Sequence, residues 1–299
     1  MNSRNRREVC VKLSGRLGNQ MFQYAAGLGL ARRIGATLTL DGAPADSAAK
    51  SRIQVIRSFS LPESCYYSGT SLAESVSRVL ARSFGVRRAP LRKHGLPIIH
   101  EAGLEFDPTL TNGNQGCYLV GRWQSARYFE TEEAEIRKTF DLSRYSTVAV
   151  RDDEQRIRRE PMPVAIHLRR GDYATNPRTL SRFGLCTRPY YDAARRHLES
   201  VTRPSHYFVF SDDPAAARAE LAGWTDTTFI SGHGAEEDLW LIGQCRHAII
   251  SNSTFGWWGG WLIPPAPGKI IVAPKQWFSE AMQKRKPPRD IYCADWVKI

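Results

Sequence analysis

The segment richest in chemically active side chains is HLRRGDY, residues 167–173, directly after the apolar run PVAI. The run predicts a buried strand over PVAIHL. The two-residue period of a strand places His167 and Arg169 on one face and Leu168 on the other. Arg169 could then fork onto a diphosphate while His167 donates a further hydrogen bond. Because a buried strand end does not normally accept arginine charge without a compensating anion, the segment predicts an anion site.

The same segment has a structural interpretation. Arg170 and Asp172 could pair and hold the loop in shape, and the cluster would then be a network of salt bridges. The residues alone leave both interpretations open.

A second candidate is the loop GRLGNQ, residues 15–20, between the expected strand REVCVKL and a helix that Gly35 closes. Two glycines before a helix allow a ligand to approach the backbone, and the first helical N–H groups attract an anion. The loop is neither a P-loop nor a complete GxGxxG fingerprint. We expect Arg16, Gly18 and Asn19 to contact a ligand; the alternative is a tight turn in which Asn19 caps the helix.

The third cluster, SDDP at 211–214, contains two adjacent carboxylates. Alternation sends neighbouring side chains of a strand to opposite faces, which disfavours a shared metal ion. Asp212 or Asp213 could recognise a nucleobase or ribose. Equally, the segment suits a helix start, with an acidic cap and Pro214 at the first helical position.

The fourth cluster is SNST, residues 251–254, before the aromatic stretch FGWWGGWL. Its hydroxyl and amide groups could cap a helix and meet a phosphate together; these are Ser251, Asn252, Ser253 and Thr254. The tryptophans have helical spacing, so we expect core packing, with sugar stacking as the alternative.

All four clusters follow expected strands, at the ends where open α/β sheets bind ligands. Short β-rich runs alternate with helices, which predicts an α/β protein. We expect two Rossmann-like lobes facing a central cleft, residues 1–155 and 156–299, divided near the charged stretch RDDEQRIRREPMP. Residues 41–115 show the least clear pattern, because helix-like pieces alternate with loops that contain proline and glycine.

The chain has 299 residues and a net charge of +12, and of its 42 basic residues 9 are lysine, so 33 are arginine. Such a balance suits nucleic acid, an anionic membrane surface or a phosphorylated small molecule. No nucleic-acid recognition module is present, which disfavours the first class. Six scattered cysteines without a CxxC pair disfavour structural zinc. The N-terminus lacks the apolar segment of a signal peptide and no run reaches a membrane span, so we expect a cytoplasmic protein.

Taken in order, the motifs GRLGNQMFQYAAG, GRWQSARYF, HLRRGDY, FSDDP, EEDLWLIGQCRHAIISNS and TFGWWGGWL resemble the α-1,2-fucosyltransferases of glycosyltransferase family 11. The HxRRGD core is shared more loosely with α-1,6- and protein O-fucosyltransferases. The resemblance implies a GT-B-like fold and a GDP-β-L-fucose donor. It also implies inversion at the anomeric carbon, no metal or other cofactor, and an α-1,2-linked fucose on galactose.

Carried onto this sequence, the resemblance and the clusters give three sets of residues. The catalytic set comprises Arg169 and His167 at the β-phosphate, together with Asp172. The donor-binding set comprises Arg16, Gly18, Asn19, Arg170, Asp212, Asp213, Asn252, Ser253 and Thr254. The acceptor-binding set comprises Arg122, Trp123 and Gln124.

The base that would deprotonate the acceptor hydroxyl is not identified. Asp172 is one candidate, the acids at 236–238 are others, and a dissociative mechanism with little base assistance is a further alternative. The expected acceptor is a galactose-terminated oligosaccharide or glycolipid for surface polysaccharide or O-antigen. The basic surface favours peripheral contact with the inner face of a bacterial cytoplasmic membrane. Two alternatives stand beside this reading: α-1,3 or α-1,6 transfer on the same fold, and a non-catalytic polyanion-binding protein.

Overall fold

The computed structural model describes residues 7–42, 55–59, 61, 92–112, 115–285 and 287–299. Most of residues 41–115, where the sequence pattern predicts no clear elements, lies outside these ranges.

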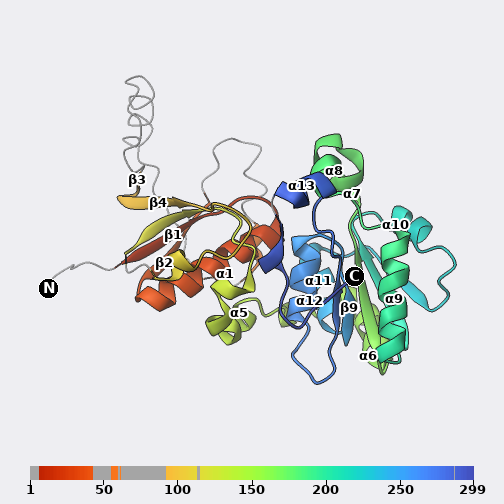
Figure 1. The fold of residues 1–299 in the computed structure, drawn as a ribbon. Coiled ribbons are helices and arrows are strands. Elements are labelled where there is room, and N and C mark those ends of the chain that lie inside the picture. Colours follow the sequence, from red (N-terminus) through yellow and green to blue (C-terminus); the bar gives the residue numbers. More distant parts are fainter. Residues whose placement is uncertain (1–6, 43–54, 60, 62–91, 113–114, 286) are drawn as a thin grey trace. The chain divides into compact units, whose positions relative to one another are not determined.

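The chain divides into two compact units, residues 1–139 and 140–299 (Figure 1). The sequence placed the division between residues 155 and 156. The charged stretch at that point is instead helix α6 (Arg151–Arg159), whose Ile157 is fully buried. A helix with a buried apolar side chain is part of a unit rather than a linker, so residues 140–155 belong to the second unit.

The first unit contains a five-stranded sheet of order β2-β1-β5-β4-β3, in which the β3–β4 pair is antiparallel and the other pairs are parallel. Its strands are β1 (Glu8–Lys12), β2 (Thr37–Asp41), β3 (Arg92–Lys93), β4 (Leu96–His100) and β5 (Cys117–Val120). Its helices are α1 (Leu17–Ile34), α4 (Pro108–Asn112) and α5 (Glu133–Thr139), with 3-10 turns at Val55–Ser58, Ala126–Tyr128 and Glu130–Glu132.

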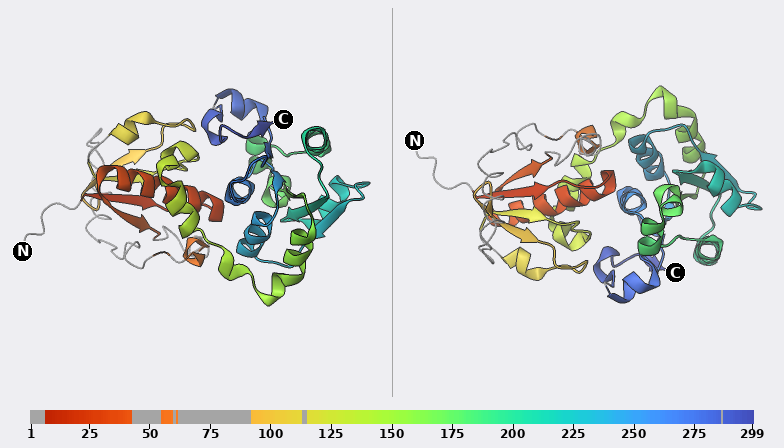
Figure 2. Two further views of the ribbon diagram at one scale, coloured as in Figure 1. Left: turned by 90° about the horizontal axis from the view of Figure 1, so that it is seen from below. Right: turned by 90° about the horizontal axis from the view of Figure 1, so that it is seen from above.

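Helix α1 lies along this sheet (Figures 1 and 2). It ends as the sequence predicts, at Gly35 in the left-handed conformation with φ +63°. It begins at Leu17, inside the expected loop. Almost all of its residues are buried, because its small side chains allow close contact with β1 and β2: at Gly27, a Cβ atom would come within 2.4 Å of Val11.

The second unit contains a six-stranded sheet of order β11-β10-β9-β6-β7-β8, in which every pair is parallel. Its strands are β6 (Pro163–Leu168), β7 (His206–Ser211), β8 (Thr227–Ile230), β9 (His247–Ile249), β10 (Ile271–Ala273) and β11 (Val297–Lys298). Its helices, besides α6, are α7 (Gly171–Thr175), α8 (Pro177–Phe183), α9 (Arg188–Val201), α10 (Pro214–Glu220), α11 (Ala235–Gly243), α12 (Thr254–Leu262) and α13 (Glu280–Arg285). Short 3-10 turns lie at Ser143–Tyr145, Val148–Val150 and Arg289–Ile291.

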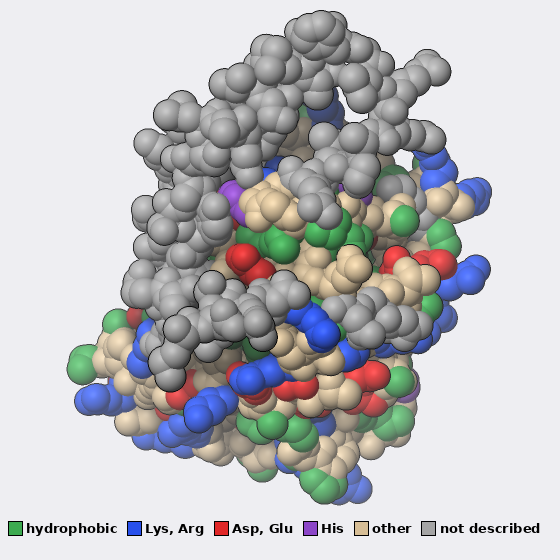
Figure 3. Space-filling model, turned by 90° about the vertical axis from the view of Figure 1, so that its left-hand side faces the viewer, with side chains coloured by type: hydrophobic (Ala, Val, Ile, Leu, Met, Phe, Trp, Pro, Cys, Tyr) green, Lys and Arg blue, Asp and Glu red, His purple; other side chains and the backbone are tan. Residues whose placement is uncertain are grey.

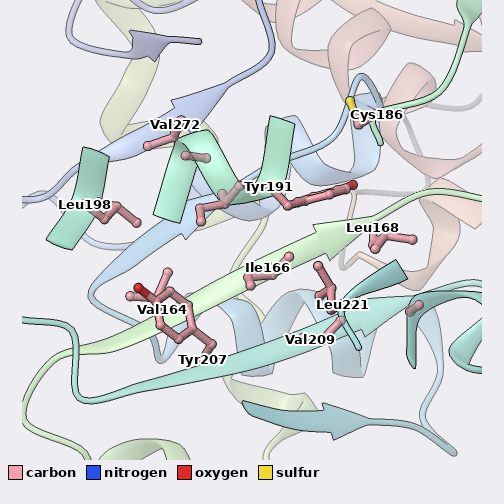
Figure 4. Close-up of a cluster of buried hydrophobic side chains, with 13 residues drawn as sticks. Val164, Ile166, Leu168, Cys186, Tyr191, Leu198, Tyr207, Val209, Leu221 and Val272 are labelled. Atoms are coloured by element: carbon pink, nitrogen blue, oxygen red, sulfur yellow. The ribbon is translucent and has the colours of Figure 1, made fainter. Parts of the chain in front are cut away.

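Strand β6 is buried along its whole length, as expected for a parallel strand covered on both faces. Its residues Val164, Ile166 and Leu168 pack with Tyr191 and Leu198 of α9 in one apolar cluster (Figure 4). Burying such side chains stabilises a fold by about 1.5–3 kcal/mol each. The alternate residues of β6, including His167, face the other side of the sheet, where α12 lies.

The tryptophans of α12 are core residues, which confirms the packing interpretation. Trp257 and Trp258 are fully buried and Trp261 nearly so. The Trp257 indole N–H donates to the Ile291 carbonyl at 2.6 Å, which satisfies its polar atom. The predicted α/β class is confirmed: both units are Rossmann-like, the type of unit that makes up GT-B enzymes. In the described part of the chain, no helix has the length and apolar character needed to cross a bilayer.

Candidate functional site

Three of the four predicted clusters meet at one edge of the second sheet. In the parallel register, Leu168 pairs with Ser211 and Ile166 with Ile249, so β6 and β7 end at the same level and β9 ends two residues earlier, which places Ser251 beside the end of β6. The residues that follow these strands are therefore neighbours at the carboxyl edge, as the sequence predicts.

The contacts that hold Arg169 at this edge include those with Asp212 and Tyr173. Its Nη1 lies 2.8 Å from Asp212 Oδ2, and its guanidinium carbon lies 5.4 Å from the centre of the Tyr173 ring. Its side chain is 13% exposed. A carboxylate and an aromatic ring together fix the orientation of a planar cation, so the guanidinium is set before any ligand arrives.

Asp212 also closes the loop between β6 and α7. Its second oxygen, Oδ1, accepts a hydrogen bond from the Arg170 backbone N–H at 2.8 Å. Residue 171 is glycine with φ +23°, and a Cβ atom there would lie 2.1 Å from Asp212 Oδ2. Only glycine accommodates both the backbone conformation and the carboxylate.

The side chain of Arg170 is bound inside the unit. Its Nη1 donates to the Cys186 carbonyl at 2.8 Å, its Nη2 pairs with Glu220, and the residue is 5% exposed. The sequence placed Arg170 among the donor ligands and offered Asp172 as its partner. The structure pairs it with Glu220 at the end of α10, so we revise its role to holding the loop that carries Arg169.

His167 is buried between Ser251 and α12. Its Nδ1 lies 2.8 Å from Ser251 Oγ, and its ring centre lies 5.3 Å from that of Phe255. Burial, reinforced by the nearby charge of Arg169, lowers the pKa of His167 to about 3. The imidazole is therefore neutral at physiological pH.

The start of α12 is capped as predicted. Ser253 is the N-cap, and its hydroxyl accepts from the Phe255 N–H at 3.3 Å; Thr254 is the first helical residue. The partial positive charge of this helix end favours an anion. Asn252 differs from the expectation, because its amide donates to the carbonyls of Phe183 at 2.9 Å and Trp277 at 3.2 Å. We revise its role to bracing the loop.

The two acids after β7 have different roles. Asp213 caps α10, its Oδ1 accepting from the Ala216 N–H at 3.0 Å, with Pro214 at the first helical position. This confirms the capping interpretation for Asp213 and leaves Asp212 as the carboxylate at the site. Among the described residues, no group of three or more His, Cys, Asp or Glu side chains could hold a metal ion.

The first sheet also gathers predicted residues at its carboxyl edge. Val11 pairs with Leu119, so the loops after β1 and β5 are neighbours. The Gln124 Nε2 donates to Asn19 Oδ1 at 2.8 Å. A Cβ atom at Gly15 would lie 2.5 Å from Arg122 Nη1 and 2.6 Å from Asn19 Nδ2, so these two side chains converge over the glycine.

The helix-cap interpretation of Asn19 is wrong. Arg16 occupies the N-cap position without a side-chain cap, and Asn19 and the buried Gly18 belong to the first turn of α1. The reason is that α1 starts at Leu17, earlier than the sequence predicts. The Asn19 side chain instead ties α1 to the loop after β5.

Of the three predicted acceptor residues, Arg122 has an exposed side chain, whereas Trp123 and Gln124 are buried. Trp123 adopts φ +55°, which is uncommon for a bulky residue. Glu101 stabilises this turn, because its carboxylate accepts from the backbone N–H of Arg122 at 2.7 Å and of Trp123 at 2.8 Å. We revise Trp123 and Gln124 to structural roles.

Glu101 is the residue that the sequence reasoning missed, and the contact of Ser251 with His167 was not predicted. Glu101 directly follows β4, whose sequence LPIIH is a short apolar run, and His100 pairs with Val120. The sequence signal for Glu101 was an acid directly after an expected strand, since such a residue can contact the loop that follows the neighbouring strand. Ser251 follows β9 in the same way beside His167.

The candidate bases lie in two different helices, α7 and α11. Asp172 lies in α7, and its side chain is outside the described part of the structure. The acids at 236–238 lie in the first turn of α11, where Glu237 Oε2 accepts from the Gly234 N–H at 2.8 Å. Burial raises the pKa of Asp238 to about 7. The Glu237 carboxylate therefore caps the start of α11 through its bond to Gly234.

The chain is similar to known glycosyltransferases over most of its length. The family model described as Glycosyl transferase family 11 matches residues 102–299. An Escherichia coli alpha-1,2-colitosyltransferase is 29% identical, covering 97% of this chain and 98% of that protein. The E. coli O-antigen biosynthesis glycosyltransferase WbnK is 30% identical, covering 89% and 94%. The Mus musculus galactoside 2-alpha-L-fucosyltransferase Sec1 is 26% identical, covering 97% and 73%. The matched range, residues 102–299, contains Arg169, Asp212 and Ser253, and the chain belongs to glycosyltransferase family 11.

Proposed function

We propose that this glycosyltransferase moves L-fucose from GDP-β-L-fucose to the 2-hydroxyl of a galactoside, with inversion and without a metal ion. The observation that carries the proposal is the Arg169 guanidinium, fixed by Asp212 and Tyr173 at the carboxyl end of β6. It lies in the same strand-end cluster as His167 and the capped start of α12. Together these groups offer an anion a guanidinium, a neutral imidazole and a helix N-terminus.

The reaction develops charge where these groups would act. As the bond between the anomeric carbon and the GDP oxygen breaks, negative charge grows on the β-phosphate and the sugar becomes oxocarbenium-like. A positioned guanidinium forks onto phosphate oxygens, and a helix N-terminus adds N–H groups. Because these donors are fixed in advance, they stabilise the transition state without reorganisation, which is the role a divalent cation plays elsewhere.

Inversion follows when the acceptor oxygen attacks from the face opposite GDP. The new bond joins the galactoside O2 to the anomeric carbon, GDP leaves with the electron pair of the broken bond, and the hydroxyl proton passes to a base or to solvent. We keep Asp172 as a candidate base on its position after Arg170. In the first unit, Arg16, Asn19 and Arg122 are the candidates for contacts to the sugars.

The relatives support the linkage and the pathway. Two of them carry α-1,2 or 2-α transfer in their names, and a third acts in O-antigen synthesis. We therefore place the product in a surface polysaccharide or O-antigen. Colitosyl transfer is a second candidate, because the colitosyltransferase matches 97% of this chain. Transfer in α-1,3 or α-1,6 linkage is the alternative that product analysis distinguishes.

Polyanion binding is less well supported. On the face shown in Figure 3, the visible Lys and Arg side chains are interspersed with Asp and Glu side chains. Binding to a nucleic-acid backbone favours a continuous basic stripe. We expect GDP-selective binding at physiological salt, in contrast to the steep salt dependence of a polyanion binder.

A peripheral contact with anionic membrane would bring the enzyme to a glycolipid acceptor. The net charge of +12 supports such a contact. Co-sedimentation with anionic but not neutral vesicles at physiological salt is the expected result. Equal recovery with both vesicle types would contradict it.

The proposed activity is tested by incubating the protein with GDP-fucose and a panel of β-galactosides that includes lactose, with EDTA present. We expect a fucosylated product whose NMR spectrum shows an α-1,2 linkage. Activated colitose in a parallel reaction tests the second donor. Turnover that EDTA abolishes and a divalent cation restores would contradict the metal-free mechanism, and absence of GDP binding would contradict the donor site.

A further inference from the structure

Ser251 contacts His167 twice. The Ser251 backbone N–H donates to the His167 carbonyl at 3.1 Å, and the Ser251 Oγ lies 2.8 Å from His167 Nδ1. Ser251 is fully buried and His167 is 5% exposed. The contact is therefore shielded from water, and the two side chains must satisfy each other's hydrogen-bonding groups.

The imidazole has no freedom to turn away from this contact. A Cβ atom at Gly256 would lie 2.6 Å from His167 Nδ1, so α12 packs directly against that edge of the ring. The Phe255 ring lies on the same side of the sheet, with its centre 5.3 Å from that of His167. Strand β6 fixes the backbone below. The ring position is thus defined on three sides.

The hydrogen-bond partner of His167 Nδ1 determines which ring nitrogen carries the proton. Ser251 Oγ carries one proton that needs an acceptor, and His167 Nδ1 is its hydrogen-bond partner. If Nδ1 carried the proton, it would donate to Ser251 Oγ, and the buried hydroxyl proton would then have no acceptor among the described residues. Burial also lowers the pKa of His167 to about 3, which excludes the doubly protonated ring at physiological pH. The remaining arrangement is the neutral ring with its proton on Nε2.

We infer that Ser251 is a positioning residue that fixes His167 as the Nε2–H tautomer, so that His167 presents a neutral hydrogen-bond donor to the leaving diphosphate. Nε2 has no hydrogen-bond partner among the described residues, so its proton is available to a ligand. In this role His167 donates a hydrogen bond throughout the reaction and does not transfer a proton. The assignment of Nε2–H to the diphosphate rests on the proposed function; the tautomer itself does not.

The direct test is the ¹⁵N spectrum of protein labelled at its histidines, in which protonated and unprotonated ring nitrogens have widely separated shifts. His167 is one of 7 histidines and is assigned by its loss in His167→Gln. We expect an unprotonated Nδ1 and a protonated Nε2 in the wild type at neutral pH. In Ser251→Ala we expect the signals to move toward a mixture of tautomers, and in Ser251→Thr to return.

A matched control is available in the same spectrum. His206 Nε2 lies 2.8 Å from Thr228 Oγ1, a second histidine–hydroxyl pair at the start of β7. Thr228→Val is expected to change the His206 signals and leave both the His167 signals and turnover unaltered. The control therefore distinguishes the specific loss of the Ser251 hydroxyl from a general destabilisation of the second unit.

Turnover provides the functional readout. Because the ring remains but is no longer held in one tautomer, we expect Ser251→Ala to lower kcat by about tenfold, less than the 10²–10³ typical for complete loss of a donor. The acceptor KM should be unchanged, and Ser251→Thr should recover most of the loss. A wild-type spectrum with Nδ1 protonated, or a spectrum that Ser251→Ala leaves unaltered, would overturn the inference. If the tautomer is as stated but GDP leaves the His167 signals in place, the contact of Nε2–H with the diphosphate is overturned and the tautomer stands, whereas the proposed function is judged by turnover.

Discussion

Arg169 Nη1 and Asp212 Oδ2 lie 2.8 Å apart at the ends of two adjacent parallel strands. The register brings them together, because Leu168 pairs with Ser211 and each residue is the next one along its own strand. The Arg169 side chain is mostly buried, so the contact is shielded from water more than a surface pair. The pair orients the guanidinium on which the proposed mechanism depends.

Substitutions of the adjacent residues Asp212 and Asp213 should have different effects, the first on activity and the second on stability. Asp212→Asn removes the charge that orients Arg169, and we expect kcat/KM for GDP-fucose to fall at least about tenfold, since one misplaced donor weakens transition-state stabilisation. Asp213→Ala removes the cap of α10, and we expect about 1 kcal/mol less stability with little change in kcat. Steady-state kinetics and denaturant unfolding of both variants provide the check. Loss of activity in Asp213→Ala at full folding would contradict these roles.

The neutral state of His167 makes stability depend on pH. Its pKa is about 3 in the folded protein against an ordinary 6.5, so between these values the unfolded chain binds a proton that the folded protein excludes. Stability from this residue is complete above about pH 6.5 and is lost as pH falls toward 3, by up to about 1.4 kcal/mol per pH unit. Urea unfolding between pH 4 and 7 should show a steeper dependence in the wild type than in His167→Gln. Equal slopes would contradict a buried neutral imidazole.

The strand-end clusters could be predicted from sequence because parallel topology brings loops after neighbouring strands together. HLRRGDY, SDDP and SNST each follow a short β-rich run, and the sheet order places β6 between β7 and β9. The capping roles of Asp213 and Ser253 could also be predicted from sequence, since helix caps depend on local residue types. The predicted central cleft remains a prediction.

The directions of the two arginine side chains after β6 could not be predicted. Arg169 and Arg170 are adjacent and identical in type, yet one reaches the edge and the other pairs with Glu220, far along the chain. This difference depends on where α10 ends in the folded unit. Tertiary structure sets that position, and the local sequence around the two arginines does not. The boundary expected near residue 155 differs from the observed one for a similar reason, since the charged stretch forms α6, whose one apolar residue, Ile157, is buried.

Asp238 should make the protein less stable at higher pH. Burial raises its pKa from 3.8 to about 7, while His233 acts in the opposite direction. The folded protein therefore holds a proton that the unfolded chain lacks, and stability falls as pH rises from about 4 to 7. Asp238→Asn should be more stable than the wild type at pH 8, by on the order of 1–4 kcal/mol, and similar at pH 4. Glu236→Gln, at a neighbouring acid, serves as the control. Equal thermal midpoints of Asp238→Asn and the wild type at pH 8 would contradict the raised pKa.

The contact between α12 and His167 predicts a local steric effect. In Gly256→Ala the new methyl group would lie 2.6 Å from His167 Nδ1, so either the ring or the helix must move. We expect a loss of about 1–3 kcal/mol in stability, as for other overpacked sites, together with reduced kcat. Gly243→Ala, at the end of α11, meets nothing within 4 Å and should be neutral or slightly stabilising. Thermal melts and turnover of the two variants give the comparison, and a Gly256→Ala protein with wild-type values in both would refute the packing described.

The measurement that tests the central claim most directly is kcat for GDP-fucose transfer in Arg169→Ala, in EDTA, beside wild type and Arg196→Ala. Arg196 is an exposed arginine of α9 in the same unit, so its variant controls for loss of one positive charge. We predict a fall of about 10²–10³ or more in kcat for Arg169→Ala, no significant change for Arg196→Ala, and thermal midpoints near wild type for both. Transfer at the wild-type rate in Arg169→Ala would contradict the claim that this guanidinium stabilises the leaving diphosphate.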